Sequence, residues 1–389
     1  MPSLEACIAL KHALAEEQLV CMPLDRDPHR TVLCTRAAYV HRLKTLFVDD
    51  TTHYEVCTAT PATIEARWRE MFDAAGWRRY GHFDARGSVG YAYCFAKAKN
   101  LAKSRVIVSC AKHPLRSILH LVGRVLIQLL LRSAFPSFNL YSLQEFTARL
   151  EEYSQTVDPS DSLFGLYTDV EEMYTGMKHG AILDAVAFVL ELCKAALRSP
   201  YVSVAKQHRG AFHVGQSRAK GVATFHLDDL LPFVRFELEN LCFTLGPEVL
   251  LRQVIGAPMG GFTSPGCAQC VAAVAEYRCM RLVLASSRLF AARYMDDTFC
   301  VLNITATQRC SATLSEMLHP LLHMFADSGL EVEVEPALWA PCCHPASLWA
   351  AVSSAPFGTR TPTLRPPAPS VCAAFCRASP RRALLSARS

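Results

Sequence analysis

The chain lacks a long apolar run, although 51% of its 389 residues are hydrophobic. The longest candidate, residues 118–131, is interrupted by His120, Arg124 and Gln128. It is therefore too polar to cross the hydrocarbon core of a bilayer. The first twenty residues contain both acidic and basic side chains, so they lack the apolar centre of a secretory signal. We expect neither a membrane partner nor a secreted protein.

The sequence also lacks the cysteine spacing of a disulfide framework. Its 17 cysteines are odd in number and scattered through apolar stretches, so we expect reduced core residues. Cys267 and Cys270 form one C-x-x-C pair, and Cys342, Cys343 and His344 form a second cluster. A zinc site needs four ligands, and neither cluster has an obvious partner, so zinc is the weaker alternative.

Acidic residues are missing from two long segments. Residues 341–389 contain arginines but no acid, and without them the basic and acidic residues of the chain nearly balance. Between Ala85 and Gln144 there is no Asp or Glu, while Lys97, Arg105 and other basic residues are present. Charge of one sign on a folded segment indicates a polyanion nearby. A solvated helix face is the alternative that the sequence leaves open.

Hydrophobic periodicity divides the chain into predicted elements. Strands are expected at 105–109, 163–170 and 330–335, helices at 63–75, 114–132, 181–198, 227–241, 267–285 and 312–327, and a polar loop at 209–221. After Pro336 the periodicity ends, and Ala, Pro, Ser and Arg dominate. Such a composition buries little surface and predicts disorder. A wrong exon or reading frame would produce the same pattern.

The sequence Tyr-Met-Asp-Asp at 294–297 lies between two apolar runs, 289–293 and 298–302. Both runs are rich in β-forming residues, so the segment predicts a hairpin with Asp296 and Asp297 at its turn. Adjacent carboxylates repel unless a cation lies between them, and Mg²⁺ prefers oxygen ligands. An Asp pair is also common in ordinary turns. The hairpin alone therefore does not distinguish a metal site from a simple turn, and other segments of the chain are needed.

Two further segments carry candidate site residues. A predicted strand ends at Asp169, in position to hold a metal, and Tyr174 follows in the turn beyond it. A strand-capping Asp and a core Tyr are the alternatives. The segment 253–265 is rich in glycine, which lets backbone approach a ligand closely. Ser264 followed by Pro265 predicts a helix start there, so a simple helix-entry loop is also possible.

In this order, the three segments resemble the palm motifs A, B and C of reverse transcriptases. The matching segments are, in order, the strand ending at Asp169, the Met-Gly-x-x-x-Ser-Pro loop at 259–265 and the Tyr-x-Asp-Asp hairpin. Residues 169–175 and 293–299 are similar to the Asp-Val-x-x-Leu-Tyr-Thr and Arg-Tyr-Val-Asp-Asp-Thr-Phe motifs of Penelope-like retroelements. The similarity extends over about residues 20–335 and is strong only in the palm motifs.

The resemblance implies an α+β fold of the right-hand polymerase type, with fingers and a palm formed by an antiparallel sheet backed by helices. It implies an RNA-directed DNA polymerase whose partners are a primed RNA or DNA template and deoxynucleoside triphosphates. Two Mg²⁺ ions, which Mn²⁺ can replace, would be held by the catalytic residues Asp169, Asp296 and Asp297 and by the backbone of Val170. The implied nucleotide-binding residues are Lys97 and Arg105 for the triphosphate, Tyr174 as the gate against ribose, Met259 and Gly260 for the incoming base, and Ser264.

The resemblance also predicts the regions of the chain. They are the start of the fingers (1–90), a basic fingers region (91–160), the palm (161–335, with a fingers portion near 200–225) and a disordered tail (336–389). No thumb or GIY-YIG nuclease is recognisable, and no lysine follows Lys220, although many reverse transcriptases carry one beyond the hairpin. A catalytically impaired nucleic-acid-binding remnant therefore stays open. A viral RNA-dependent RNA polymerase is a further alternative, although such enzymes more often carry Gly-Asp-Asp.

Overall fold

The computed structural model describes residues 3–25, 27–132, 136–158, 161–207, 211–247, 249–283, 288–304 and 318–341. The chain forms two compact units, each built from two separate stretches of sequence. The first unit comprises Met1–Ala134 and Tyr174–Val271, and the second comprises Phe135–Met173 and Ala272–Ser389.

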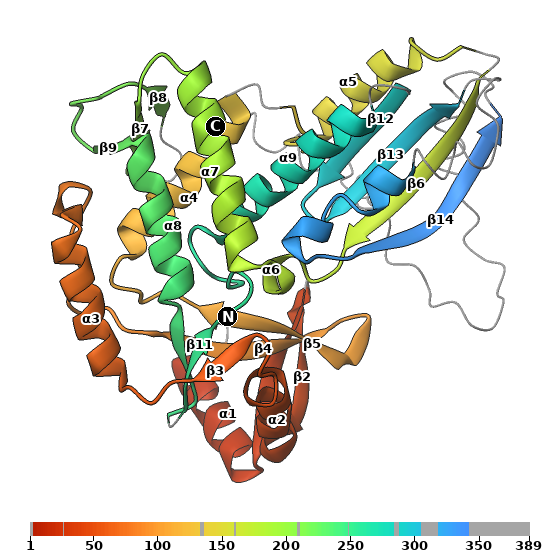
Figure 1. Ribbon diagram of the computed structural model, residues 1–389. Helices are drawn as coiled ribbons and strands as arrows, with labels where there is room; N and C mark the ends of the chain where they lie inside the picture. Colours follow the sequence, from red (N-terminus) through yellow and green to blue (C-terminus); the bar gives the residue numbers. More distant parts are fainter. Residues whose placement is uncertain are drawn as a thin grey trace, which may run out of the picture. The chain divides into compact units, whose positions relative to one another are not determined.

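A seven-stranded sheet is the centre of the first unit (Figure 1). Its strand order is β2-β1-β4-β10-β11-β3, with β5 paired to β4. The strands are β1 (Leu19–Asp25), β2 (Asp27–Thr35), β3 (Tyr54–Val56), β4 (Gly90–Lys97), β5 (Asn100–Ser109), β10 (Cys242–Leu245) and β11 (Val249–Gln253). Both β1 and β10 run parallel to β4, whereas the other pairs are antiparallel. One buried cluster on this sheet is built on the aromatic rings of Phe47, Tyr54 and Phe243.

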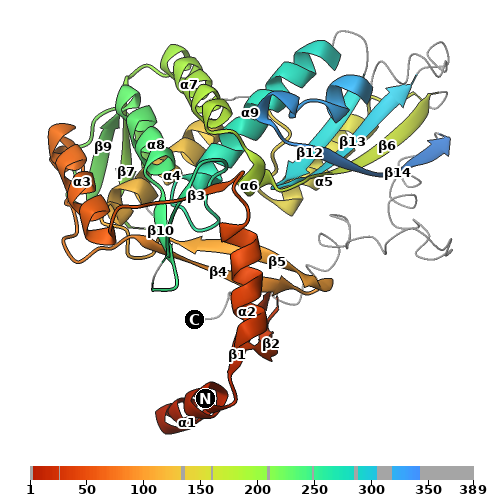
Figure 2. The same ribbon diagram turned by 60° about the horizontal axis from the view of Figure 1, so that its bottom comes forward.

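Helices of the first unit follow from apolar periodicity and from capping residues. They are α1 (Leu4–Glu16), α2 (Arg36–Leu43), α3 (Pro61–Ala74), α4 (Arg116–Arg132), α7 (His179–Ala196) and α8 (Leu230–Glu239). In α3, the side chain of Thr60 accepts from the backbone N–H of Thr63, and Pro61 takes the first helical position. Figure 2 shows the hairpin of β1 and β2 lying near α2.

The predicted helices of the first unit are confirmed, with ends that shift by a few residues. The helix expected at 227–241 begins with a 3₁₀ turn, Leu227–Asp229, and ends at Glu239 because β10 starts shortly afterwards. The loop expected at 209–221 was wrong in part. It contains β8 (Phe212–Val214), which pairs with β7 (Tyr201–Ala205) in a sheet that β9 (Val222–His226) completes.

The second unit is built on a four-stranded antiparallel sheet in the order β12-β13-β6-β14. Its strands are β6 (Ser162–Val170), β12 (Arg288–Tyr294), β13 (Asp297–Ile304) and β14 (Val332–Pro341). On one face, Leu163 and Val301 pack with side chains of α5 (Leu143–Ser154). On the other, Leu166 and Cys300 pack with Cys279 of the long helix α9 (Ser264–Val283). The strands and the hairpin predicted here are therefore confirmed.

Strand β14 continues to Pro341, so the prediction that regular structure ends at Pro336 needs correction. The register of β14 against β6 shifts between Glu335 and Leu338. A bulge on an edge strand tolerates a proline, because the missing N–H is not needed for the ladder there. Of the helix expected at 312–327, residues 312–317 lie outside the described part of the chain. Residues 318–322 are helical, and a 3₁₀ turn, Ala326–Ser328, takes the place of its predicted end. Residues 342–389 also lie outside the described part.

Among the described residues, no helix combines the length and the hydropathy needed to cross a membrane.

Candidate metal centre

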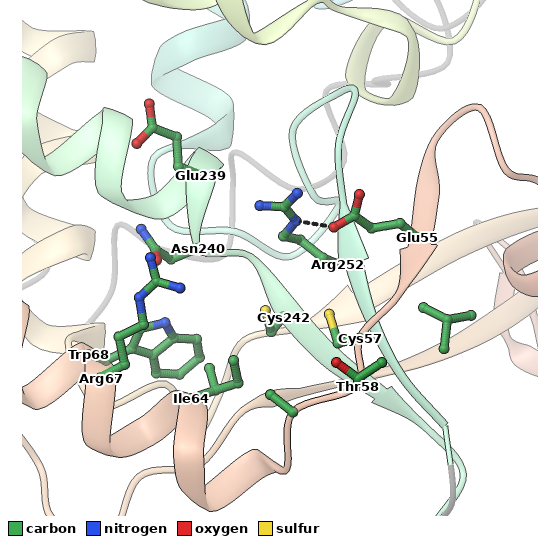
Figure 3. A pocket seen from close by; sticks show the side chains of 12 residues that line it. Glu55, Cys57, Thr58, Ile64, Arg67, Trp68, Glu239, Asn240, Cys242 and Arg252 are labelled. Atoms are coloured by element: carbon green, nitrogen blue, oxygen red, sulfur yellow. Dashed lines mark hydrogen bonds and ion pairs between the residues drawn. The ribbon is translucent and has the colours of Figure 1, made fainter.

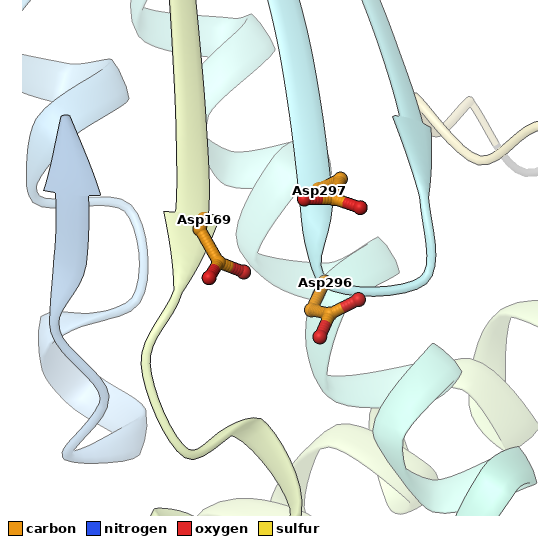
Figure 4. A group of neighbouring side chains, drawn as sticks. All are labelled: Asp169, Asp296 and Asp297. Carbon is orange, nitrogen blue, oxygen red and sulfur yellow. The ribbon is translucent and has the colours of Figure 1, made fainter. Parts of the chain in front are cut away.

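Three aspartates meet at one end of the four-stranded sheet (Figure 4). Asp169 lies near the end of β6, Asp297 begins β13, and Asp296 lies in the turn before it. The antiparallel register places Asp169 directly opposite Asp297. One ligand oxygen from each of the three carboxylates lies within 4.8 Å of the other two, and all three side chains are half-buried. The structure thus brings together the three residues that the sequence predicted as catalytic.

The hairpin turn consists of Met295 and Asp296, because Tyr294 pairs with Asp297. Met295 has a φ of 61°, a conformation that residues other than glycine adopt rarely. Positive φ at the first turn residue matches the twist of a two-residue hairpin. The backbone N–H of Val170 donates to the carbonyl of Asp296 at 3.1 Å. The tip of the hairpin is therefore tied to β6.

Two neighbours of the aspartates, Tyr167 and Glu333, were not predicted as site residues. The hydroxyl of Tyr167 donates to the carboxylate of Asp297, and Glu333 of β14 lies opposite Asp169. Directly opposed residues of an antiparallel pair share a face, so three acids form a row across β13, β6 and β14. The sequence showed glutamates alternating in the last predicted strand. The pairing of that strand with β6 was needed to identify Glu333 as the one beside Asp169.

The donor set fits a hard divalent cation. Carboxylate oxygens are the ligands that Mg²⁺ and Mn²⁺ prefer, and a cation would relieve the repulsion between the three aspartates. Val170 is buried, and its backbone lies next to Asp169 in the strand. In the parts of the chain that the structure describes, no other three His, Cys, Asp or Glu side chains gather in this way.

The cysteines do not form a second metal centre in the described part. Cys267 and Cys270 are buried in α9. Burial raises the pKa of the Cys267 thiol to about 12, so the thiol stays protonated and is a poor ligand at neutral pH. The cluster predicted at 342–344 lies outside the described residues.

Lys97 and Arg105, predicted to bind triphosphate, lie in the first unit on the hairpin of β4 and β5. The guanidinium Nε of Arg105 is 3.2 Å from a carboxylate oxygen of Asp25. Asp25 of β1 is also the register partner of Lys97. Both predicted phosphate-binding cations therefore have one aspartate as a neighbour, and an anionic ligand would compete with it.

Tyr174 and the glycine-rich loop also belong to the first unit, and the structure brings them together. The backbone N–H of Ala257 donates to the carbonyl of Tyr174 at 2.7 Å. Gly260 has a φ of 142°, and a Cβ there would lie 2.3 Å from the carbonyl oxygen of Val108 on β5. Only glycine fits this contact. Met259, next to it, is half-buried.

A buried acid holds the far end of this loop. The carboxylate of Glu237 accepts from the backbone N–H groups of Phe262 and Thr263, at 2.9 and 3.0 Å, and from the hydroxyl of Thr263. Burial raises the pKa of Glu237, while these donors oppose the rise. Ser264, predicted as a helix cap, is buried as the first residue of α9. A side chain of α8 therefore holds the loop that contains the predicted base-binding residues.

A separate pocket of about 340 Å³ lies in the first unit (Figure 3). The guanidinium of Arg252 donates to Glu55 at 2.6 Å on its wall, and the neighbouring thiols of Cys57 and Cys242 also line it. Burial raises the pKa of Cys242 to about 12, so it is not a nucleophile at neutral pH. None of the predicted site residues lines this pocket.

The fold is similar to that of telomerase, a reverse-transcriptase-like polymerase. Apo telomerase from Candida tropicalis aligns with a TM-score of 0.59 and 12% identity, covering 86% of this chain and 54% of that one. Telomerase from Candida albicans, in complex with the TWJ fragment of telomeric RNA, aligns with a TM-score of 0.58 and 13% identity, covering 85% and 51%. This chain spans about half the length of those it matches. No family model and no curated protein matches the sequence.

Similarity at this level of identity establishes the fold alone. The α+β palm-and-fingers architecture predicted from the sequence is confirmed, whereas the similarity to Penelope-like elements stays a prediction. The chain has a reverse-transcriptase-like polymerase fold.

Proposed function

We propose that this protein is an RNA-directed DNA polymerase of retroelement origin, most similar to the Penelope-like group. It would add deoxynucleotides to the 3′-hydroxyl of a primer on an RNA or DNA template. The observation that carries the proposal is the meeting of Asp169, Asp296 and Asp297 at one end of an antiparallel palm sheet. Three carboxylates so placed could hold a divalent cation, which prefers oxygen ligands.

The aspartates would hold two Mg²⁺ ions, with the backbone of Val170 as a further ligand. When bound, these ions would activate the primer hydroxyl and stabilise the charge of the leaving pyrophosphate. Tyr167 would orient Asp297 through its hydrogen bond. The backbone bond from Val170 to Asp296 would keep the hairpin tip in place beside β6.

Nucleotide selection would fall to residues of the first unit. Lys97 and Arg105 would bind the triphosphate, and Arg105 would exchange Asp25 for phosphate as it does so. Tyr174 would clash with a ribose 2′-hydroxyl and so favour deoxynucleotides. The loop of Met259, Gly260 and Ser264 would border the incoming base, supported by its hydrogen bonds to the buried Glu237.

Primer extension by the full chain tests the proposal. Wild-type protein should extend a primer on an RNA template with dNTPs and Mg²⁺. Asp296→Asn should lower the rate about a thousandfold, because metal ligands supply several kcal/mol of transition-state stabilisation. Asp327→Asn is the matched control, since the side chain of Asp327 is 87% exposed, and should keep wild-type activity.

Two outcomes would contradict the proposal. If folded wild-type protein binds a primed duplex in a salt-sensitive manner without extending it, the chain is a nucleic-acid-binding remnant. If it prefers rNTPs strongly over dNTPs, Tyr174 is not a gate against ribose and the protein is an RNA polymerase.

A further inference from the structure

A fully buried ion pair lies on the α9 side of the catalytic hairpin. Glu276 of α9 and Arg293 of β12 contact each other through Oε1 and Nε, and both side chains have no exposed surface. Arg293 is opposite Thr298, one position from the row that contains Asp297. Its side chain therefore occupies the opposite face of the sheet from that of Asp297, directly beside the turn.

Hydrogen bonds to the backbone of residues 138–140 hold the pair in place within the second unit. The second carboxylate oxygen of Glu276 accepts from the backbone N–H of Phe138 at 2.8 Å. The backbone N–H of Arg293 donates to the carbonyl of Phe138 at 2.7 Å, and its carbonyl accepts from Leu140 at 2.8 Å. These bonds connect three segments that are distant in sequence: 138–140, α9 and β12.

The guanidinium reaches from this anchor to the turn itself. Its Nη1 donates to the carbonyl of Met295 at 2.7 Å. That carbonyl belongs to the peptide group joining Met295 to Asp296. The carbonyl of Asp296 in turn accepts from Val170 at 3.1 Å. The peptide groups on both sides of the Asp296 Cα are therefore held, one by Arg293 and one by β6.

The buried pair between Glu276 and Arg293 has features that stability alone does not explain. Burying two charges removes both from water, and a well-packed apolar pair is often as stable as a buried ion pair. The positive φ of Met295, 61°, persists only where the surroundings enforce it. A planar guanidinium with fixed donors can enforce it, because one donor is aligned on Glu276 while another is directed at the turn.

We propose that Glu276 and Arg293 are positioning residues that set the direction of the Asp296 carboxylate and thereby the affinity of the site for divalent cation. The inference rests on the proposed function for its choice of metal. Neither residue touches substrate or metal, since both act through the Met295 carbonyl. Outer contacts of this kind typically change metal affinity about 10- to 100-fold when they are removed.

The test uses the full chain with Mn²⁺ as the probe, titrated by electron paramagnetic resonance, beside a thermal unfolding curve for each variant. The double variant Glu276→Gln with Arg293→Gln leaves no unpaired buried charge, and its shorter side chain at 293 cannot reach Met295. We expect it to fold and to bind Mn²⁺ about tenfold more weakly. Arg278→Gln, on the same helix but 57% exposed, should bind as wild type does.

A second variant covers the case in which the double variant does not fold. Arg293→Lys keeps the charge opposite Glu276 but loses the fork that bonds Met295 at the same time. It should weaken Mn²⁺ binding less than the double variant. Wild-type Mn²⁺ affinity in either folded variant would overturn the inference.

Activity separates this inference from the proposed function. If the protein polymerises, the variants should raise the Mg²⁺ concentration for half-maximal rate by the same factor as the Mn²⁺ dissociation constant, with a smaller effect on the KM for dNTP. If wild-type protein binds Mn²⁺ but does not polymerise, weaker binding by the variants supports the positioning role while the polymerase proposal fails. If wild-type protein binds no Mn²⁺, both fail.

Discussion

Asp169 on β6 lies directly opposite Asp297 on β13, and the two carboxylates share one face of the palm sheet. Residues so paired have Cβ atoms about 5 Å apart, at which distance like charges are destabilising. Glu333 occupies the position opposite Asp169 on the other side. The sheet thus concentrates negative charge where a cation would relieve it.

Because of this repulsion, replacing Asp169 should stabilise the metal-free protein and destabilise the Mg²⁺-bound protein. Asp169→Asn should raise the unfolding free energy in the presence of a chelator, by about 1 kcal/mol, because it removes one of the opposed charges. The same variant should lose the stabilisation that Mg²⁺ gives wild-type protein through binding. Thermal unfolding with chelator and with Mg²⁺ measures both. Glu333→Gln is the control, since it removes a charge from the row but none of the three ligands, and it should keep the Mg²⁺ response.

The hydroxyl of Tyr167 should contribute to metal binding through Asp297. Tyr167→Phe removes one hydrogen bond to a charged group, worth about 1.5–3 kcal/mol, so we expect the nucleotide incorporation rate at limiting Mg²⁺ to fall about tenfold or more. Tyr153→Phe is the comparison, because that hydroxyl donates to the Val301 carbonyl, at 3.4 Å. Equal rates in the two variants would show that Tyr167 does not act on the site.

Gly260 should tolerate no side chain. Gly260→Ala would place a Cβ 2.3 Å from the Val108 carbonyl oxygen, so the loop must move. We expect a loss of dNTP affinity together with a lower unfolding temperature. Gly246→Ala separates crowding from backbone strain, since Gly246 also has a positive φ, 66°, but a Cβ there meets nothing within 4 Å. If the two variants lose the same dNTP affinity and the same unfolding temperature, the close contact between Gly260 and the Val108 carbonyl does not matter for binding or stability.

His113 should make the first unit sensitive to acid. Burial lowers its pKa from 6.5 to about 4, and its Nδ1 accepts from the backbone N–H of Leu115 at 3.1 Å. The folded protein holds the neutral form, so the unfolded chain binds the proton more readily. The associated stability is complete above pH 6.5 and is lost as the pH falls through 4, by about 3 kcal/mol in all.

Denaturant unfolding at pH 7 and at pH 4.5 measures this effect. His113→Gln should lose less unfolding free energy on acidification than wild type does, whereas the same substitution at the exposed His12 should not change the loss. A wild-type-like loss in His113→Gln would assign the acid sensitivity to other groups.

The hairpin and its partner strand could be predicted from the sequence. The hairpin follows from a local residue pattern, and the partner strand follows from a recognisable motif. A two-residue turn between alternating β-forming residues determines the register of β12 and β13. The pairing of β6 with β13 came from the resemblance to palm motifs, and the carboxylates meet as that resemblance implied. The helices α4 and α7 followed from strong apolar periodicity.

What the sequence could not reveal depends on contacts between distant segments. Glu276 is the one acid in the long helix α9, and Arg293 was part of the hairpin motif but had no predicted contact with it. Their burial depends on each other and on the backbone of Phe138. Strand β8 was missed because three residues carry too little pattern, and the hydrogen bonds that define it come from β7.

We expect Asp169, Asp296 and Asp297 to bind divalent metal together. Crystals of the full chain soaked in Mn²⁺, with anomalous scattering measured at the manganese edge, would reveal the ion directly. Anomalous peaks should lie within about 2.3 Å of carboxylate oxygens of all three residues and be absent from crystals of Asp169→Asn. Manganese elsewhere on the protein, with none at these aspartates, would contradict it.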